Sequence, residues 1–424
     1  MRIDRRNFLA GVASASALYA QGEKPIRLGI VGTGNRGRAH IVAIKALPRQ
    51  FQIVALADPT PGSLDLAATL VPGAKTYSDY QKMLAEQKDL DAVIVITPSF
   101  LHADITVAAL NHSLHVLCEK PIATRIEDAN RMIDAAKKSG KLLYIGFQKR
   151  FVPAHAKLHE LAAAGAIGKI EFISANLFRG DWNPLSWKYT DPKTGVATNW
   201  RYLTHTQGSA LLEDGIHEMD ILNWIVNDRV AYVTATGGNN VFKQRETIDH
   251  AAMMVEYESG VKLSFDFCLF GANAGPQGRR MVFIGSEGIM YPENGKIAVR
   301  QRQGGEVRYV DLVVPEAKVA NDRETYYQYQ EFARDLNSGK PAAVAPEAGK
   351  LAVKIMLMAE RSLRERRIMK WTDLPASARS QRYRFFNSAG VSCTAGLTRT
   401  IGSDVRASAS SAGPAISRLQ TSSN

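Results

Sequence analysis

The stretch Ile26-Arg-Leu-Gly-Ile-Val-Gly-Thr-Gly-Asn-Arg-Gly-Arg-Ala-His40 decides the fold of this chain. Its apolar residues from Ile26 to Val31 predict a short buried strand, and the glycines that follow have the spacing G-x-G-x-x-G at the point where a helix would begin. Such a loop lets a pyrophosphate approach the backbone and directs the positive N-terminal end of the helix at the phosphates. We therefore predict that a dinucleotide is bound by Gly32, Thr33, Gly34, Asn35, Arg36 and Gly37.

The end of the second predicted strand supports this interpretation, because a glycine trio alone also serves purely steric turns. That strand, Phe51 to Ala57, is followed by Asp58, near the place where dinucleotide-binding folds carry an acid for the adenosine ribose hydroxyls. A carboxylate there would repel a 2′-phosphate, and the next residues, Pro59-Thr60-Pro61, offer no cation to neutralise one. The sequence therefore predicts NAD rather than NADP as the cofactor.

Length and composition indicate an ordinary globular protein with room for two domains. The chain has 424 residues, of which 45% are hydrophobic and 22% charged. Much of its formal charge of +12 comes from the two ends, and no basic stripe with interleaved aromatic residues appears, so we expect no nucleic-acid partner. The cysteines Cys118, Cys268 and Cys393 are far apart and lack metal-binding spacing, so no metal site is predicted and no disulfide is required.

Residues 1–22 are predicted to be a twin-arginine export signal. Arg5-Arg6 precede a weakly apolar run rich in Ala, Ser and Gly, which is too short to span a membrane. A disordered N-terminus with a chance Arg-Arg pair is the alternative. Because this route carries folded proteins, we expect a periplasmic protein that binds its dinucleotide before export and does not insert into the membrane.

Residues 25–150 are predicted to form an α/β domain of the Rossmann type, with a doubly wound parallel sheet. Near-continuous apolar strands alternate with helical patterns, which is typical of a sheet covered on both faces. Ligands of such sheets bind beyond the carboxyl ends of the strands, where Thr97-Pro98 and Glu119-Lys120 fall. The strands are predicted at Ile26–Val31, Gln52–Ala57, Ala92–Thr97, His115–Cys118 and Leu142–Gly146, and helices include Ser78–Gln87 and Ile126–Ser139.

Residues 151–371 are predicted to form a second, α+β domain with a mostly antiparallel sheet, which would bind substrate and mediate oligomerisation. Apolar residues alternate in longer runs, and breaks such as Glu258-Ser259-Gly260 fit hairpin turns. The predicted strands are Lys169–Phe178, Ala231–Thr236, Ala251–Tyr257, Val261–Leu269, Arg280–Ile284 and Ile297–Val299, and the helices are Pro153–Ala164, Glu324–Leu336 and Glu347–Arg364.

A long segment, Gly180 to Asn227, separates the first two of these strands. It carries Trp182, Trp187, Trp200 and His205, and a loop of this length inside a compact domain is usually functional, so we predict that it forms a wall of the substrate pocket. At the other end of the domain, residues 372–424 are dominated by Ser, Ala and Arg with few acids. They are predicted to be a disordered basic tail.

Several local motifs resemble those of the Gfo/Idh/MocA family of sugar-linked oxidoreductases, over roughly Pro25 to Trp371. The resemblance implies a Rossmann domain, an open C-terminal sheet whose exposed face forms homo-oligomers, and a tightly held nicotinamide cofactor beside Thr97, Pro98, His102, Glu119 and Lys120. One departure is Glu213, where the family more often has Asp four residues before its histidine. The motifs are the glycine loop, Thr97-Pro98 with His102, Glu119-Lys120-Pro121, Gly146-Phe147-Gln148-Lys149-Arg150 and the segment from Gly208 to Asp220.

Three residues are predicted to carry the chemistry of oxidising a hydroxyl. Lys120 would place a cation beside the developing alkoxide. His217 would act as base or acid, since an ordinary histidine titrates near neutral pH. Glu213, four positions earlier on a predicted helix, would orient that imidazole. A solvated lysine, a core histidine and a helix-start charge are the structural alternatives.

Substrate contacts are predicted for Gln148, Arg150, Trp200 and Asp214, although Arg150 could equally pair with a carboxylate between the domains; Asp220 is expected to be structural. The leading hypothesis is an NAD-dependent oxidoreductase acting on a sugar or polyol hydroxyl, with a small sugar or glycoside as its partner. The alternative is a glycoside hydrolase that uses bound NAD for transient oxidation and elimination. A second alternative is a non-catalytic dinucleotide-binding sensor.

Overall fold

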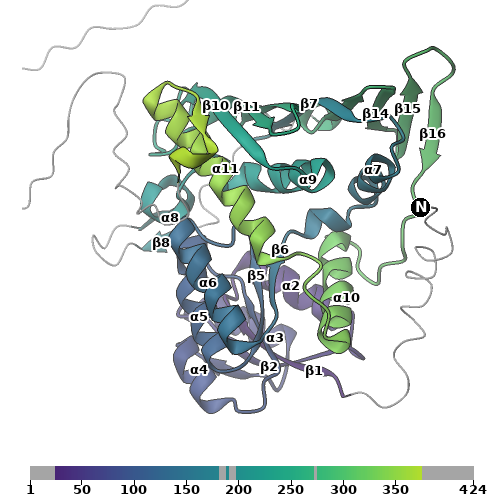
Figure 1. Ribbon diagram of the computed structural model, residues 1–424. Coiled ribbons are helices and arrows are strands. Elements are labelled where there is room, and N and C mark those ends of the chain that lie inside the picture. Colours follow the sequence, from purple (N-terminus) through teal and green to yellow (C-terminus); the bar gives the residue numbers. More distant parts are fainter. Residues whose placement is uncertain (1–23, 181–187, 191–196, 272–274, 375–424) are drawn as a thin grey trace, which may run out of the picture. The chain divides into compact units, whose positions relative to one another are not determined.

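The computed structural model describes residues 24–180, 188–190, 197–271 and 275–374, and every structural statement below refers to them (Figure 1). The predicted export signal, Trp182, Trp187 and Cys393 lie outside the described residues, as does the predicted tail from residue 375 onward. What the sequence predicts for these segments and residues therefore stays a prediction.

The N-terminal domain contains a six-stranded sheet in the order β3-β2-β1-β4-β5-β6, and its strand pairs are all parallel. Helices α2 and α3 cover one face of this sheet and α5 and α6 cover the other, which confirms the predicted doubly wound fold (Figure 1). The prediction missed β3 because it is a short edge strand with two exposed polar residues. The strands are β1 (Ile26–Val31), β2 (Phe51–Ala57), β3 (Lys75–Tyr77), β4 (Ala92–Val95), β5 (His115–Glu119) and β6 (Leu143–Gly146); the helices are α2 (Asn35–Lys45), α3 (Pro61–Leu70), α4 (Tyr80–Glu86), α5 (His102–Asn111) and α6 (Ile126–Ser139).

The C-terminal domain contains a nine-stranded sheet in the order β16-β15-β14-β13-β7-β12-β11-β10-β17. All of its pairs are antiparallel except β7 with β12, so the mostly antiparallel prediction is confirmed. Helices α7 (Pro153–Ala163), α9 (Ile216–Val226) and α11 (Pro346–Glu365) lie along one face (Figure 1). The strands are β7 (Ile170–Phe178), β10 (Val230–Gly238), β11 (His250–Tyr257), β12 (Lys262–Cys268), β13 (Met281–Gly285), β14 (Gly288–Glu293), β15 (Lys296–Gln301), β16 (Arg308–Asp311) and β17 (Met369–Lys370).

The segment from Gly180 to Asn227 is not the long loop that was predicted. Its described part contains a hairpin of β8 (Lys188–Thr190) and β9 (Ala197–Asn199), a 3₁₀ turn (Trp200–Tyr202), α8 (Thr204–Gln207), a π-helical turn (Leu211–Gly215) and α9. Apolar residues are buried on all sides of α9, among them Ile216, Met219 and Leu222. A helix was expected around His217, but a helix buried all round shows no amphipathic period, so its bounds could not be predicted.

Helix α10 (Arg323–Ser338) belongs to the chain beyond residue 150 but packs on the N-terminal sheet. The Phe332 ring stacks on Phe51 at 6.3 Å between centroids and meets Tyr144 edge-on at 5.5 Å, and Tyr329 meets Phe51 at 5.7 Å. Helix α11 likewise contacts α6 and β6 as well as β10. The last two helices therefore tie the two domains together.

Candidate active site

The glycine loop has the geometry that a pyrophosphate site needs. Gly32 has φ +95°, and a Cβ there would lie 2.4 Å from the Ile96 carbonyl oxygen; a Cβ on Gly37 would lie 2.2 Å from the Gly32 oxygen. A Cβ on Gly34 would meet nothing within 4 Å. The first and third glycines therefore permit the turn and the close packing of the helix, and the second leaves open space at the helix N-terminus.

Asp58 lies at the carboxyl end of β2 beside this loop. Its carboxylate accepts the Thr33 backbone N–H at 2.7 Å and the Thr60 backbone N–H at 2.8 Å, which holds it in place. The hydroxyls of Thr33 and Thr97 are buried and have no hydrogen-bond partner among the described residues. Orphaned hydroxyls beside an open glycine loop fit a dinucleotide, because each could bond to one of its polar atoms.

Arg36 and Glu119, which were both predicted to bind the cofactor, bind each other through their side chains. The Arg36 Nε donates to Glu119 Oε1 at 2.8 Å, and its other nitrogens donate to Asp322 at 2.5 Å and to Thr325 at 3.0 Å, next to and within α10. His40 Nε2 lies 2.8 Å from the same Glu119 oxygen. Burial opposes ionisation of Glu119, but Arg36 and His40 outweigh it and hold the pKa of Glu119 well below its usual value. The buried side chains of His40 and Glu119 are thus linked to the partly exposed Arg36 of the glycine loop.

The other predicted cofactor residues follow β1 and β4. Asn35 is the first residue of α2 and accepts from Arg38 at 2.5 Å, and Pro98 precedes a short 3₁₀ turn. His102 is buried, with Nδ1 2.8 Å from the Pro121 carbonyl oxygen and Nε2 3.0 Å from that of Thr97. Both ring nitrogens of His102 therefore face backbone carbonyl oxygens, which fixes the orientation of the ring.

Lys120 follows β5, and the peptide bond to Pro121 is cis. Its ammonium lies 2.9 Å from the Glu213 carboxylate and 2.9 Å from the Glu213 backbone carbonyl, while its backbone N–H donates to Glu119. Two hydrogen bonds to Glu213 therefore hold the lysine ammonium in place. This contact also joins the carboxyl edge of the N-terminal sheet to the segment that precedes α9.

Glu213 does not orient His217, which corrects the prediction. Besides Lys120, its carboxylate accepts from Arg201 at 2.8 Å and from the Ser99 hydroxyl at 2.6 Å. The cause is the π-helical turn that contains Glu213, because its wider i→i+5 pattern shifts this residue off the face of His217. A spacing of four residues assumes an unbroken α-helix.

Asp214 and Trp200, predicted to touch substrate, are buried around Arg201. Asp214 accepts from Arg201 and from Arg179, each at 2.9 Å. Burial opposes its charge, but the two arginines outweigh burial and lower the pKa of Asp214. The Arg201 guanidinium lies over the Trp200 ring at 5.4 Å from its centroid. Sequence reasoning missed Arg179 and Arg201, because no motif surrounds either one.

His217 is buried next to these charges. Its Nδ1 has no hydrogen-bond partner among the described residues, and its ring meets the edge of Phe147 at 6.0 Å. Burial is the main reason that the pKa of His217 lies well below its usual value, and the positive charges of Lys149 and Lys120 lower it further. The imidazole is therefore neutral at neutral pH and able to accept a proton.

Gln148 and Arg150 hold structure together near the site. Arg150 makes a bidentate ion pair with Asp220, at 2.7 and 2.6 Å, which is the alternative considered for this arginine. With its amide oriented to satisfy both of its groups, Gln148 accepts from Arg36 at 3.0 Å and donates to the Gly146 carbonyl at 2.7 Å. Two of the five Arg150 N–H donors are therefore taken by Asp220, and both groups of the Gln148 amide have protein partners.

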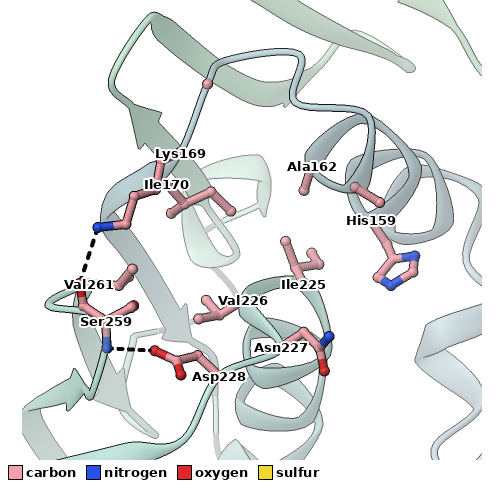
Figure 2. Close-up of a pocket in the computed structure, with 12 residues that line it drawn as sticks. His159, Ala162, Lys169, Ile170, Ile225, Val226, Asn227, Asp228, Ser259 and Val261 are labelled. Carbon is pink, nitrogen blue, oxygen red and sulfur yellow. Dashed lines mark hydrogen bonds between the residues drawn. The ribbon is translucent and has the colours of Figure 1, made fainter. Parts of the chain in front are cut away.

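A pocket of about 450 Å³ lies elsewhere in the C-terminal domain, between α7 and the end of α9 (Figure 2). None of the predicted site residues lines it. The two charged side chains among its lining residues already have partners in the protein. The Lys169 ammonium donates to the Ser259 carbonyl at 3.1 Å, and the Asp228 carboxylate accepts from the Ser259 N–H at 2.9 Å (Figure 2). The candidate active site is therefore the group of residues around Lys120.

Comparison with known proteins agrees with this arrangement. Residues 26–147 match the family model described as "Oxidoreductase family, NAD-binding Rossmann fold", and residues 155–291 match the GFO/IDH/MocA C-terminal domain, together more than half of the chain. The chain belongs to the GFO/IDH/MocA oxidoreductase family. Its N-terminal domain is accordingly an NAD-binding Rossmann domain, as predicted.

Known proteins similar to this chain include inositol dehydrogenases. The chain is 26% identical to a myo-inositol 2-dehydrogenase of Thermotoga maritima over 81% of this chain and 98% of that protein. It is 23% identical to a scyllo-inositol 2-dehydrogenase (NAD(+)) of Bacillus subtilis over 81% and 95%. A levoglucosan dehydrogenase solved with NADH has the same fold, with a TM-score of 0.71 and 22% identity over 83% of this chain and 100% of that one.

The described residues contain no helix that is both long and apolar enough to cross a membrane.

Proposed function

We propose that this GFO/IDH/MocA oxidoreductase oxidises a hydroxyl of a polyol or sugar. The observation that carries the proposal is the fixed ammonium of Lys120, which follows β5 beside the glycine loop and lies near the neutral imidazole of His217. The names of the inositol dehydrogenases to which the chain is similar support the same substrate class.

Lys120 would bind the reacting hydroxyl. A lysine ammonium has three N–H donors, and Glu213 accepts two of them, through its carboxylate and its carbonyl. The third donor can bond to the substrate oxygen and stabilise the negative charge that develops on it. Glu213 holds the ammonium in position, and Arg201 and Ser99 hold Glu213.

His217 would take the proton of the hydroxyl. Its low pKa keeps the imidazole in the neutral form that accepts a proton, and its Nδ1 has no competing partner among the described residues. NAD, when bound at the glycine loop, supplies the hydride acceptor. Gly32, Gly34, Gly37 and Asp58 would hold it by backbone approach and by hydrogen bonds to the ribose.

The experiment is to incubate the purified protein with NAD and a panel of polyols, sugars and glycosides, and to measure NADH by absorbance. We expect net NADH with at least one polyol or sugar. Release of free sugar from a glycoside without net NADH would contradict the proposal and favour the hydrolase. Binding of NAD without turnover of any compound would favour a sensor.

We further propose that the protein is exported to the periplasm with NAD already bound. The support is Arg5-Arg6 together with the glycine loop. Protein purified from the periplasm and then denatured should release nicotinamide nucleotide in about equal molar amount. Finding none would count heavily against loading before export.

We also propose that the protein forms homo-oligomers through the C-terminal sheet. On strands β10 and β11, Tyr232 and Met254 remain 40% and 45% exposed, while their neighbours Val233 and Met253 are buried under the helices. Large apolar side chains on one sheet face are typical of a protein interface.

A further inference from the structure

Five cations and three carboxylates in and around the candidate active site form three sets of shared ion pairs, here called the charged cluster. Each carboxylate is shared by two cations: Glu213 by Lys120 and Arg201, Asp214 by Arg201 and Arg179, and Glu218 by Lys149 and Arg279. The distances are 2.9 and 2.8 Å for Glu213, 2.9 and 2.9 Å for Asp214, and 2.7 and 3.9 Å for Glu218. All three carboxylates come from residues 213–218, around the start of α9.

The cations of the cluster are more accessible than the carboxylates. The Glu218 side chain is only 2% exposed, whereas Lys149 is 14% and Arg279 is 53% exposed. The same holds one turn earlier, where Glu213 is 4% and Lys120 is 12% exposed. A molecule that enters the site therefore meets ammonium and guanidinium groups, while the negative charges lie behind them.

The cations of the cluster also act on one another. Burial lowers the pKa of Lys149, and although Glu218 opposes this, the charges of Arg279 and Lys120 lower it further. The same Lys149 and Lys120 lower the pKa of His217 beyond the effect of burial. An anion beside Lys149 and Arg279 would relieve this repulsion, because opposite charges at close range in a partly buried site attract strongly.

We propose that the substrate is an acidic polyol, whose carboxylate or phosphate group binds Lys149 and Arg279 while its reacting hydroxyl binds Lys120. Arginine supplies two parallel donors to a planar or tetrahedral anion and lysine supplies a point charge, so the pair suits either group. This proposal rests on the proposed polyol oxidation and makes its substrate class narrower. Neutral polyols would be poor substrates.

The test compares compounds that differ only in the acidic group. The NAD-loaded protein is assayed with D-glucitol against D-gluconate, D-glucose against D-glucuronate, and myo-inositol against its 1-phosphate. In at least one pair we expect kcat/KM to be about 10-fold or more higher for the acidic compound, with the advantage falling as NaCl is raised, because salt screens the attraction. The first two pairs test a carboxylate and the third tests a phosphate. Equal or higher kcat/KM for every neutral compound overturns the proposal.

A variant links the preference to its residue. Arg279→Gln should reduce the acidic-to-neutral ratio of kcat/KM about 10-fold. The Arg279 side chain is half exposed, so we expect the variant to fold as the wild type does, which circular dichroism checks. Arg280→Gln is the matched control, since this neighbouring arginine is exposed and its backbone N–H bonds to Asn176. An unchanged ratio in Arg279→Gln contradicts the proposal.

Measuring the affinity for these compounds tests the anion site independently of the proposed oxidation. If none of these compounds gives NADH, the polyol oxidation fails for them, and calorimetric titration of the same pairs into NAD-loaded protein still decides the anion site. Tighter binding of the acidic member, lost in Arg279→Gln, supports the site without the reaction. Equal or undetectable binding of both members contradicts it.

Discussion

The ammonium of Lys120 donates to both the carboxylate and the backbone carbonyl of Glu213, each at 2.9 Å. One side chain from the edge of the N-terminal sheet is thus held by a residue from the C-terminal domain. The contact places a cation with one remaining donor beside the glycine loop, and the chemistry proposed above depends on it.

Replacing this lysine tests its role directly. Lys120→Ala should lower kcat at least ~100-fold, because the developing alkoxide loses its cation, while the affinity for NAD measured by fluorescence titration changes little. Lys138→Ala, at an exposed position on α6, is the control and should keep the wild-type rate. A wild-type rate in Lys120→Ala would remove the lysine from the mechanism.

The pH dependence of the rate tests His217. Because the pKa of His217 is lowered, the base form persists as the pH falls, and kcat/KM should stay level through pH 6.5 and decline only at lower pH. His217→Ala should cost at least ~100-fold and abolish that decline. Lys149→Met removes a positive neighbour and should move the decline to higher pH. A wild-type decline centred at pH 6.5 or above would contradict the assignment.

Cofactor choice tests Asp58. The affinity for NAD should exceed that for NADP by about 10-fold or more, because the carboxylate accepts ribose hydroxyls and repels a 2′-phosphate. Asp58→Ser should narrow this ratio, as measured by equilibrium titration with both nucleotides. Equal or tighter binding of NADP to the wild type would overturn the prediction.

Stability should respond to a buried acid on α11. Burial raises the pKa of Glu360 to about 7, so at pH 8 the native state bears a charge that the interior disfavours. The unfolded state loses its proton near pH 4.5, so this cost grows as the pH rises from there to 7. Glu360→Gln should therefore be more stable than the wild type by about 3 kcal/mol at pH 8 and by about 1 kcal/mol at pH 5.

Urea unfolding at the two pH values measures this difference. Glu347→Gln, exposed in the first turn of the same helix, is the control and should change little at either pH. A Glu360→Gln variant that is less stable than the wild type at pH 8 would show that the carboxylate makes a favourable native contact.

The exposed face of the C-terminal sheet gives a prediction about assembly. Met254→Glu should reduce the mass measured by light scattering after size exclusion, because a charge would be buried in the proposed interface. A monomeric wild type would reject the proposed oligomer.

Local signals in the sequence predicted much of the fold. The glycine loop was predicted because each glycine has a separate steric reason, which the close approaches of Gly32 and Gly37 bear out. Helix α6 was predicted with its observed bounds, since acids begin it, lysines end it and Gly140 follows in a left-handed conformation.

Local patterns in the sequence could not predict contacts between residues that lie far apart in the chain. Asp322 binds Arg36, 286 positions earlier in the sequence, and no local pattern in the sequence relates the two residues. The π-helical turn changed the partner of Glu213, because one extra residue per turn rotates every later side chain. Sequence motifs pointed to Lys120 and Glu213 as candidates, but they did not predict the hydrogen bonds that link these two residues to each other and Glu213 to Arg201.

Helix α10 has a consequence for how the protein is made. The ring contacts to Phe51 and Tyr144 and the ion pair to Arg36 all come from residues 322–332, late in translation. A nascent chain that has emerged from the ribosome only as far as the sixth strand lacks the cover for its own first sheet. The N-terminal sheet therefore gains this cover only after residues 322–332 have left the ribosome.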